Sequence, residues 1–210
     1  MSEQRSHWDT LHRRRQASTL TDVPTAFARE CAALIDRPSA ILELGCGAGQ
    51  DAAYLADRGH TVWATDFSEV VIAANRERYR GCPNLHFRVL NIGQPLPFDR
   101  GTFDVVYAHL SLHYLPDALT RRAFREIHQV LRPRGQLFFL CKSVDDPLYG
   151  LGRPIESDMF EHEGHVRHFF SEDYAISCLG ADFEVVQIEQ GRDRSDGKPW
   201  AFVKVSAQSR

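Results

Sequence analysis

The segment ILELGCGAG, Ile41–Gly49, decides how this chain folds. An apolar stretch typical of a strand leads into Gly45, Gly47 and Gly49, and an amphipathic stretch with helical spacing begins directly after them. Glycines allow a sharp turn and a close approach of the backbone to a ligand, because they carry no Cβ atom. The first turn of a helix also presents free backbone N–H groups. The segment therefore predicts a strand–turn–helix unit with a ligand site at the turn.

Short apolar stretches alternate with longer amphipathic ones on both sides of this unit. The predicted strands are Ser39–Gly45, His60–Asp66, Asn84–Leu90, Phe103–Leu110, Gly135–Lys142, Asp182–Gln190 and Trp200–Ala207. The predicted helices are residues 5–17, 22–35, Gln50–Arg58, Ser68–Tyr79, Asp117–Leu131 and a short one from the Ser171 cap to Leu179. Strands and helices joined by short connectors indicate right-handed crossovers and a parallel sheet. We therefore expect a doubly wound α/β fold.

Two segments depart from this alternation. Residues 145–170 are rich in Asp, Gly, Pro and His and show no clear period, so we expect a long connection of functional character. Near the end of the chain, residues 192–199 have the composition of a turn between the last two strands. Those strands are predicted to form a hairpin at one edge of the sheet.

Composition limits the class of protein. The 210 residues are 43% hydrophobic and 25% charged, with a net charge of -3 that indicates no nucleic-acid partner. The five cysteines are scattered without a C-x-x-C pair, which favours a reducing compartment over a disulfide or zinc framework. No apolar run is long enough for a membrane span, and the N-terminus lacks the apolar core of a signal peptide. We expect a cytoplasmic protein without a membrane partner.

The spacing of the glycines separates two kinds of nucleotide site. A dinucleotide-binding turn reads G-x-G-x-x-G, whereas here the third glycine comes one residue early and Gln50 takes the sixth place. About 20 residues further on, Asp66 ends the second predicted strand, where a carboxylate can accept both hydroxyls of a ribose. Two simpler interpretations stay open: the glycines only make a tight turn, and Asp66 only caps the next helix, although Ser68 is the better cap.

Four segments together resemble the class I S-adenosylmethionine-dependent methyltransferase superfamily, in its small single-domain bacterial type. They are ILELGCGAGQDA, VWATDFS, NIGQPLPFDRGTFDVVYAHLSLHYL and VLRPRGQLFF. The resemblance implies S-adenosylmethionine as cofactor and a Rossmann-like sheet of order 3-2-1-4-5-7-6 with strand 7 antiparallel. Residues 1–210 would form one domain: N-terminal helices in 1–36, the cofactor-binding core in 37–143, and a substrate loop and edge hairpin in 144–210.

The resemblance also implies contacts with each part of the cofactor. The implied cofactor-binding residues are Glu43, Gly45, Gly47 and the backbone of His109 at the methionine end, Asp66 at the ribose, and Phe67, Asn91 and Ile92 at the adenine. Asn91 departs from the Asp that is common at this position. Its amide oxygen can still accept a hydrogen bond from the adenine amine, and the alternative is a plain turn residue.

Residues that could assist the reaction gather in two places. His109, His113 and Tyr114 follow the fourth predicted strand, and His165 and Arg167 lie in the stretch HEGHVRHFF. The three histidines are the catalytic candidates, because a nucleophile that arrives protonated needs a general base. Tyr114 and Arg167 are predicted to line the substrate pocket, where Arg167 could pair with a carboxylate.

Two further expectations concern the metal and the N-terminus. Histidines recur every third residue in HEGHVRHFF, whereas helical zinc ligands are four apart, so no metal site is predicted. Trp8, in HWDTLHRRR, is predicted either to cover the cofactor and so contribute to the substrate pocket, or to pack on the protein core from a solvated helix.

These features predict methyl transfer to a small-molecule nucleophile, with oxygen, nitrogen and sulfur all open as the accepting atom. Two alternatives belong to other classes. One is a nicotinamide-dependent oxidoreductase, which the glycine spacing disfavours. The other is a non-catalytic protein that only binds S-adenosylmethionine. The oligomeric state is left unknown.

Overall fold

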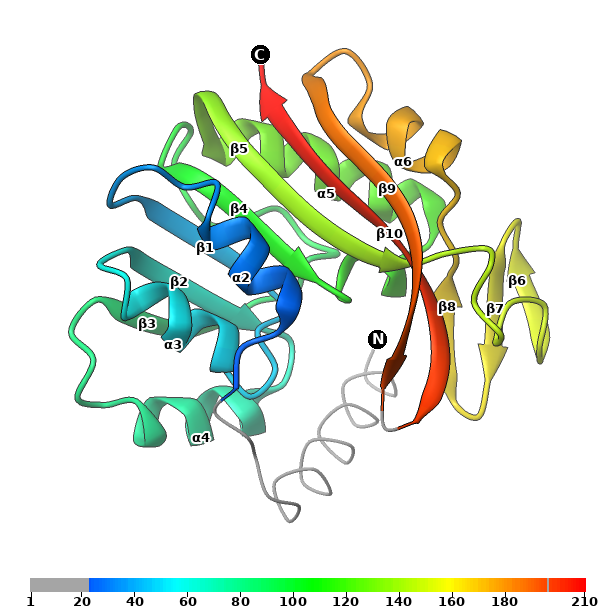
Figure 1. The fold of residues 1–210 in the computed structure, drawn as a ribbon, viewed down its shortest axis with the longest axis horizontal. Coiled ribbons are helices and arrows are strands. Elements are labelled where there is room, and N and C mark those ends of the chain that lie inside the picture. Colours follow the sequence, from blue (N-terminus) through cyan, green and yellow to red (C-terminus); the bar gives the residue numbers. More distant parts are fainter. Residues whose placement is uncertain (1–22, 196) are drawn as a thin grey trace.

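A computed structural model describes residues 23–195 and 197–210 (Figure 1). The predicted helix over residues 5–17 and the position of Trp8 lie outside the described residues. Among those residues, no helix combines the length and the apolar character needed to cross a membrane.

The described chain is built on a seven-stranded sheet of order β3-β2-β1-β4-β5-β10-β9. The strands are β1 Ala40–Leu44, β2 Thr61–Asp66, β3 Leu85–Val89, β4 Phe103–His109, β5 Leu131–Lys142, β9 Phe183–Ser195 and β10 Lys198–Ser209. β1 to β5 pair in parallel, and β10 inserts antiparallel between β5 and β9. The doubly wound fold and the strand order implied by the resemblance are therefore confirmed.

Helices cover both faces of this sheet, and each face has its own apolar core. One core packs α2 Ala26–Ala32, α3 Gln50–Ala56 and α4 Glu69–Arg78 against β1 to β5. The other packs α5 Asp117–Val130 and α6 Glu172–Leu179 against the opposite face. In Figure 1, α2 and α3 lie in front of the sheet and α5 behind it. The central strands are thus buried on both sides, as parallel strands with apolar sequences require.

Residues 145–170, expected to be a long connection, do connect β5 to α6 and also contain regular structure that the sequence did not predict. This segment contains a three-stranded antiparallel sheet of β6 Arg153–Glu156, β7 Met159–His162 and β8 His165–His168. Glu163 and Gly164, with φ of 53° and 75°, form the two-residue turn between β7 and β8. Both φ values are positive, as a type I′ hairpin turn requires. In Figure 1 the small sheet is seen to the right of the edge ribbon of β9 and β10.

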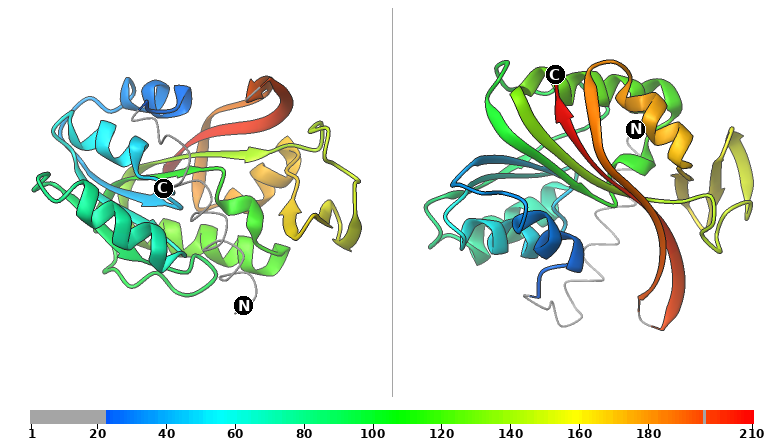
Figure 2. Two further views of the ribbon diagram at one scale, coloured as in Figure 1. Left: turned by 90° about the horizontal axis from the view of Figure 1, so that it is seen from below. Right: turned by 45° about the horizontal axis from the view of Figure 1, so that its top comes forward.

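The boundaries of two other elements also differ from the prediction. The edge hairpin is longer, because residues 192–195 and 198–199 pair as strand and only residues 196 and 197 separate them. The ribbon of β9 and β10 therefore extends well past the rest of the sheet (Figure 1 and the right panel of Figure 2). The helix α5 ends at Val130, and Pro133 lies within β5 where its pairing with β4 is irregular, so its missing N–H removes no regular ladder bond.

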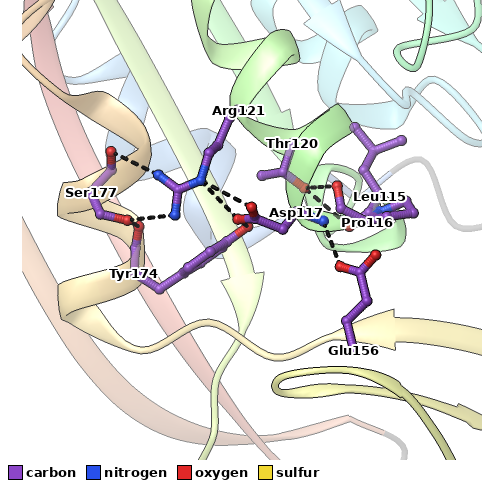
Figure 3. Close-up of polar contacts among 8 residues, drawn as sticks. All are labelled: Leu115, Pro116, Asp117, Thr120, Arg121, Glu156, Tyr174 and Ser177. Carbon is purple, nitrogen blue, oxygen red and sulfur yellow. Dashed lines mark hydrogen bonds and ion pairs between the residues drawn. The ribbon is translucent and has the colours of Figure 1, made fainter.

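Polar contacts tie the start of α5 to α6 and to the small sheet (Figure 3). Glu156 of β6 accepts a hydrogen bond from the backbone N–H of Asp117 at 2.9 Å. The Asp117 carboxylate in turn accepts hydrogen bonds from Arg121 Nε and the Tyr174 hydroxyl, both at 2.9 Å. An acidic side chain at a helix N-terminus satisfies free N–H groups and interacts favourably with the helix dipole. The network fixes the small sheet against the main body.

Candidate active site

A cavity of about 1520 Å³ opens at the carboxyl ends of the parallel strands. Gly45, Asp66, His109 and Lys142, which follow or end β1, β2, β4 and β5, all line it. Ligands of open α/β sheets bind at this edge, near the point where the strand order reverses. The volume exceeds the range of about 300–1,000 Å³ typical of a site for one small ligand, so there is room for a cofactor and an acceptor together.

The three glycines of the turn have different roles. All have positive φ, at 81° for Gly45, 50° for Gly47 and 79° for Gly49. A Cβ atom on Gly45 would collide with the side chain of Ser111, and one on Gly49 would crowd Tyr79, whereas one on Gly47 would meet nothing within 4 Å. Gly45 and Gly49 are therefore required by protein packing. Gly47 leaves open space that belongs to the cavity.

Asp66 holds the glycine turn against the start of α4. Its carboxylate accepts hydrogen bonds from the N–H of Gly47 at 3.0 Å and of Ser68 at 2.9 Å. The cap of α4 is Ser68, whose hydroxyl accepts from Val71 N–H. The helix cap is therefore not the role of Asp66. Its carboxylate lines the cavity and retains free lone pairs for a ligand, since an ionised carboxylate has about four acceptor sites.

Two acceptor atoms at this end of the cavity lack a partner among the described residues. Glu43 is only 2% exposed, and burial, with Asp51 and Asp66 nearby, raises the pKa of its carboxyl well above the usual value. Its Oε2 atom forms no hydrogen bond, and neither does Oε1 of Gln50 at the start of α3. Both side chains line the cavity. Unpaired buried acceptors are costly, so this end of the cavity is suited to a ligand that carries donors.

The predicted adenine contacts also line the cavity. Phe67, Asn91 and Ile92 form its wall beside Asp66. The Oδ1 atom of Asn91 accepts a hydrogen bond from the backbone N–H of Gly93 at 2.9 Å. The asparagine thus shapes a local turn and faces the cavity as well, so both interpretations of this residue remain compatible with the structure.

A buried carboxylate network behind the glycine turn was not predicted. Asp51, 3% exposed, accepts hydrogen bonds from Thr25 N–H at 2.7 Å, the Thr25 hydroxyl at 2.8 Å and the Tyr107 hydroxyl at 2.7 Å. Thr25 is also the N-cap of α2. The network joins α2, α3 and β4 where all three border the cavity. The one available signal for it was an Asp in the first turn of a predicted helix.

His109 stands at the end of β4 and lines the cavity. Its ring packs 5.9 Å from that of Phe27, and burial lowers its pKa although Asp51 acts in the opposite direction. Leu110, the next residue, has φ of 53°, an unusual value for a residue with a branched side chain. Backbone strain of this kind collects at functional sites. Tyr114 lines the same part of the cavity.

The other predicted catalytic histidines lie elsewhere. His113 is fully buried in the short helix η1 Leu112–Tyr114, and neither it nor His165 of β8 is among the residues that line the cavity. Their positions give no support to a catalytic role, whereas Arg167 of β8 does line the cavity. Within residues 23–195 and 197–210, no group of three or more metal-binding side chains occurs.

We predict that His113→Leu stabilises the protein by about 1 kcal/mol at pH 7.5, because neither ring nitrogen of His113 has a hydrogen-bond partner in the part of the chain that the structure describes. Burial, with Lys142 and Arg167 nearby, lowers the pKa of His113 well below its unfolded value. The unfolded chain therefore binds a proton near pH 6.5 that the folded chain rejects, and stability falls as the pH drops through that value. Urea unfolding at pH 7.5 and 5.5 should show that the free energy of unfolding changes less with pH in the variant than in the wild type. A variant that unfolds more easily at both pH values would contradict this.

The structure adds three residues to the far end of the cavity that the sequence prediction missed. Lys142 ends β5, and its Nζ atom forms an ion pair of 2.6 Å with Asp146. Trp200, early in β10, packs over this pair, with Lys142 Nζ 5.7 Å from the ring centroid. All three line the cavity. For Lys142, the rule that ligands meet the carboxyl ends of strands was an available signal.

Comparisons with known proteins agree with this geometry. A family profile described as a methyltransferase domain matches residues 41–135. The Mus musculus protein named arginine-hydroxylase NDUFAF5, mitochondrial, is 32% identical over 140 residues, which are 66% of this chain and 39% of that protein. The trans-aconitate 2-methyltransferase of Deinococcus radiodurans is 38% identical over 120 residues, 55% of this chain and 43% of that protein. The chain thus spans about two fifths of the length of these relatives.

Solved structures extend the agreement to the fold. The 1,6-didemethyltoxoflavin-N1-methyltransferase of Burkholderia thailandensis, bound to 1,6-didemethyltoxoflavin and S-adenosylhomocysteine, aligns with a TM-score of 0.76 at 22% identity. The alignment covers 99% of this chain and 88% of that one. The sheet order and the glycine turn define an α/β protein with a nucleotide-type cofactor site. Residues 41–135 thus match a methyltransferase-domain family, and the chain has the fold of the class I S-adenosylmethionine-dependent methyltransferase superfamily.

The cofactor of this superfamily is S-adenosylmethionine, and the cavity suits it. The open space over Gly47 admits a ligand against the backbone. The unpaired acceptors of Glu43 and Gln50 match the donors of an amino-acid ammonium group, and Asp66 matches ribose hydroxyls. These residues would hold the methionine and ribose parts, with Phe67, Asn91 and Ile92 at the adenine.

Proposed function

We propose that the protein transfers a methyl group from S-adenosylmethionine to a small-molecule nucleophile. The observation that carries the proposal is the pairing of unsatisfied acceptors, Glu43 Oε2 and Gln50 Oε1, with the open space over Gly47 in one cavity. Buried acceptors in a protein interior normally have a donor. Acceptors without a donor, beside a glycine that faces open space, therefore favour a ligand site over a packing defect. The remaining volume, beyond His109, is then available to the acceptor.

When bound, S-adenosylmethionine supplies a methyl group that its sulfonium has already activated for in-line displacement. The protein's contribution is to position the reactants and to exclude water. Asp66 and Glu43 would bind the cofactor. The rings of Phe27, Trp200 and Phe202 would form an apolar wall around the methyl acceptor. The backbone N–H groups of Gly45 and Cys46 both donate hydrogen bonds to Thr65 C=O at 2.8 Å, and these bonds hold the glycine turn in place.

His109 is the side chain best placed to accept a proton, if the acceptor arrives protonated. Its lowered pKa leaves the imidazole neutral at neutral pH, and a neutral imidazole can act as a base. Tyr114 lines the same space and can orient the acceptor by a hydrogen bond. The oxygen, nitrogen or sulfur identity of the nucleophile stays open in this proposal.

The relatives supply a reason to test the chemistry itself. One is named as a methyltransferase of trans-aconitate and another as an arginine hydroxylase, so similar domains carry names from different reaction classes. A non-catalytic binder and a nicotinamide-dependent enzyme also remain alternatives. We further propose a reducing, cytoplasmic setting, to which the five free cysteines are suited, and a small-molecule rather than a nucleic-acid or membrane partner.

The deciding experiment combines binding and turnover on the purified chain. Calorimetry with S-adenosylmethionine, S-adenosylhomocysteine and NADH identifies the cofactor. Incubation with methyl-labelled S-adenosylmethionine and a panel of acids, amines, phenols and thiols then detects label in a product, together with S-adenosylhomocysteine. Binding of NADH in place of S-adenosylmethionine would overturn the proposal, and cofactor binding without label transfer to any panel member would favour the non-catalytic alternative.

A further inference from the structure

The far end of the cavity differs in chemistry from the cofactor end. We call it the acceptor end, after the methyl acceptor that it would bind. We define it by Lys142, Arg167 and Trp200, which line the cavity from β5, β8 and β10. At the cofactor end the unpaired buried atoms are acceptors, Glu43 Oε2 and Gln50 Oε1. At the acceptor end they are donors, Nε of Arg167 and Nε1 of Trp200. The two ends therefore suit ligand groups of opposite hydrogen-bonding character.

Among residues 23–195 and 197–210, the charges at the acceptor end leave one cation without a paired acidic side chain. Lys142 is paired with Asp146, whose side chain is 1% exposed and also accepts hydrogen bonds from Ala201 N–H and Leu148 N–H. Arg167 forms no ion pair with an acidic side chain of the described residues. A guanidinium stays charged at any accessible pH, and its buried donor needs an acceptor. An anion in the cavity would supply both.

The two cations act on the same part of the protein. Lys142 and Arg167 are the two charges that, after burial, contribute most to lowering the pKa of His113. Electrostatic effects of this kind fall with distance, so both charges lie near that histidine.

The strand that carries Arg167 is held in place from two directions. Phe170, just after β8, donates its N–H to Lys142 C=O at 2.8 Å and accepts from Val144 N–H at 3.1 Å. On the other side of the small sheet, Glu156 of β6 binds the start of α5 (Figure 3). An arginine on an anchored strand loses less freedom when it binds a ligand than one on a free loop.

From these observations we propose that the methyl acceptor is a small organic anion, whose carboxylate or phosphate group is bound by the guanidinium of Arg167 with the Trp200 indole N–H as a second donor. The inference rests on the proposed function and names the class of its substrate. Arg167 is a binding residue in this assignment. It takes no part in the displacement itself.

The test measures binding of three matched probes to the complex with S-adenosylhomocysteine. Benzoate, phenyl phosphate and benzamide share a ring and differ in charge, and NMR titration gives a Kd for each. At least one anion should bind about tenfold or more tightly than benzamide, the scale of a hydrogen bond to a charged group. Which anion binds more tightly identifies the charged group as carboxylate or phosphate.

Variants assign the preference to Arg167. Arg167→Gln should remove the difference between anion and amide, and Arg167→Lys should retain part of it. Arg192→Gln is the matched control, because the Arg192 side chain is 75% exposed and lies outside the cavity. Calorimetry should show unchanged affinity for S-adenosylhomocysteine in all three variants, which also reports that they are folded.

The outcomes separate this inference from the proposed function. Equal Kd values for anions and benzamide, no binding of either anion, or an unaltered preference in Arg167→Gln would each overturn the inference alone. A wild-type chain that binds neither S-adenosylmethionine nor S-adenosylhomocysteine would instead overturn the proposed function.

Discussion

Gly47→Leu should fold and yet lose cofactor affinity by about 100-fold or more, which corresponds to roughly 2.7 kcal/mol of binding free energy. A Cβ atom at Gly47 meets no protein atom within 4 Å, so the new side chain is accommodated by the fold. It would fill the space beside the backbone that a cofactor must occupy. The φ of 50° is close to the left-handed helical region, where a residue other than glycine costs about 1–2 kcal/mol of stability. Calorimetry with S-adenosylhomocysteine and urea unfolding measure the two effects.

Gly59→Leu is the matched control for this variant. Gly59 also has a positive φ, 86°, and open space around it, but it is not among the residues that line the cavity. The Gly59→Leu variant should lose at least as much stability as Gly47→Leu and keep the wild-type affinity for the cofactor. Equal affinities in the two variants would mean that the space over Gly47 is not a binding site.

The cofactor end of the site could be predicted because its determinants are local. Three glycines within five residues and an Asp about 20 residues later are visible in a one-dimensional pattern. Parallel strands then bring Gly45 and Asp66 to one edge of the sheet without further information. In the structure the Gly47 N–H donates a hydrogen bond of 3.0 Å to the Asp66 carboxylate, so the two segments that the pattern pointed to are in direct contact.

At the acceptor end, Arg167 was predicted to line the substrate pocket, but Asp146 and Trp200 were not, because their positions depend on contacts between distant segments. Asp146 meets the backbone of Ala201, 55 residues later, only because β10 inserts beside β5 and the edge ribbon extends past the sheet. The strands β6, β7 and β8 have four residues each and a polar composition, which is too short for a period of two to stand out. Whether a donor such as Trp200 Nε1 finds a partner is decided by packing, which no spacing of residues encodes.

The same limit explains the outcome for the histidines. His109 and His113 are four residues apart and both follow a strand end, so the sequence ranks them almost equally. The chain turns at Leu110 with a positive φ and continues into η1, where His113 is fully buried and does not line the cavity. The path of the backbone after β4 separates the two residues, and the spacing of residues does not encode that path.

Asp66→Ala should weaken cofactor binding by about 1–3 kcal/mol, or roughly 5- to 150-fold, because it removes the acceptor expected for the ribose hydroxyls. It also leaves the N–H groups of Gly47 and Ser68 without their acceptor, so part of the loss reflects a looser turn. Asp66→Asn retains an oxygen for one of these N–H groups and should lose less. Calorimetry with S-adenosylmethionine gives the affinities, and amide hydrogen exchange at Gly47 reports the order of the turn.

Asp104→Ala is the control that separates stability from binding. Asp104 lies at the opposite end of β4 and accepts hydrogen bonds from Ala40 N–H at 2.9 Å and Arg132 at 2.6 Å. Its loss should lower the free energy of unfolding and leave the cofactor affinity unchanged, because the carboxylate is not part of the cavity. If Asp66→Ala bound the cofactor as tightly as the wild type, the ribose assignment would be wrong. Among the described residues, no other carboxylate is hydrogen-bonded to the glycine turn and could take over this role.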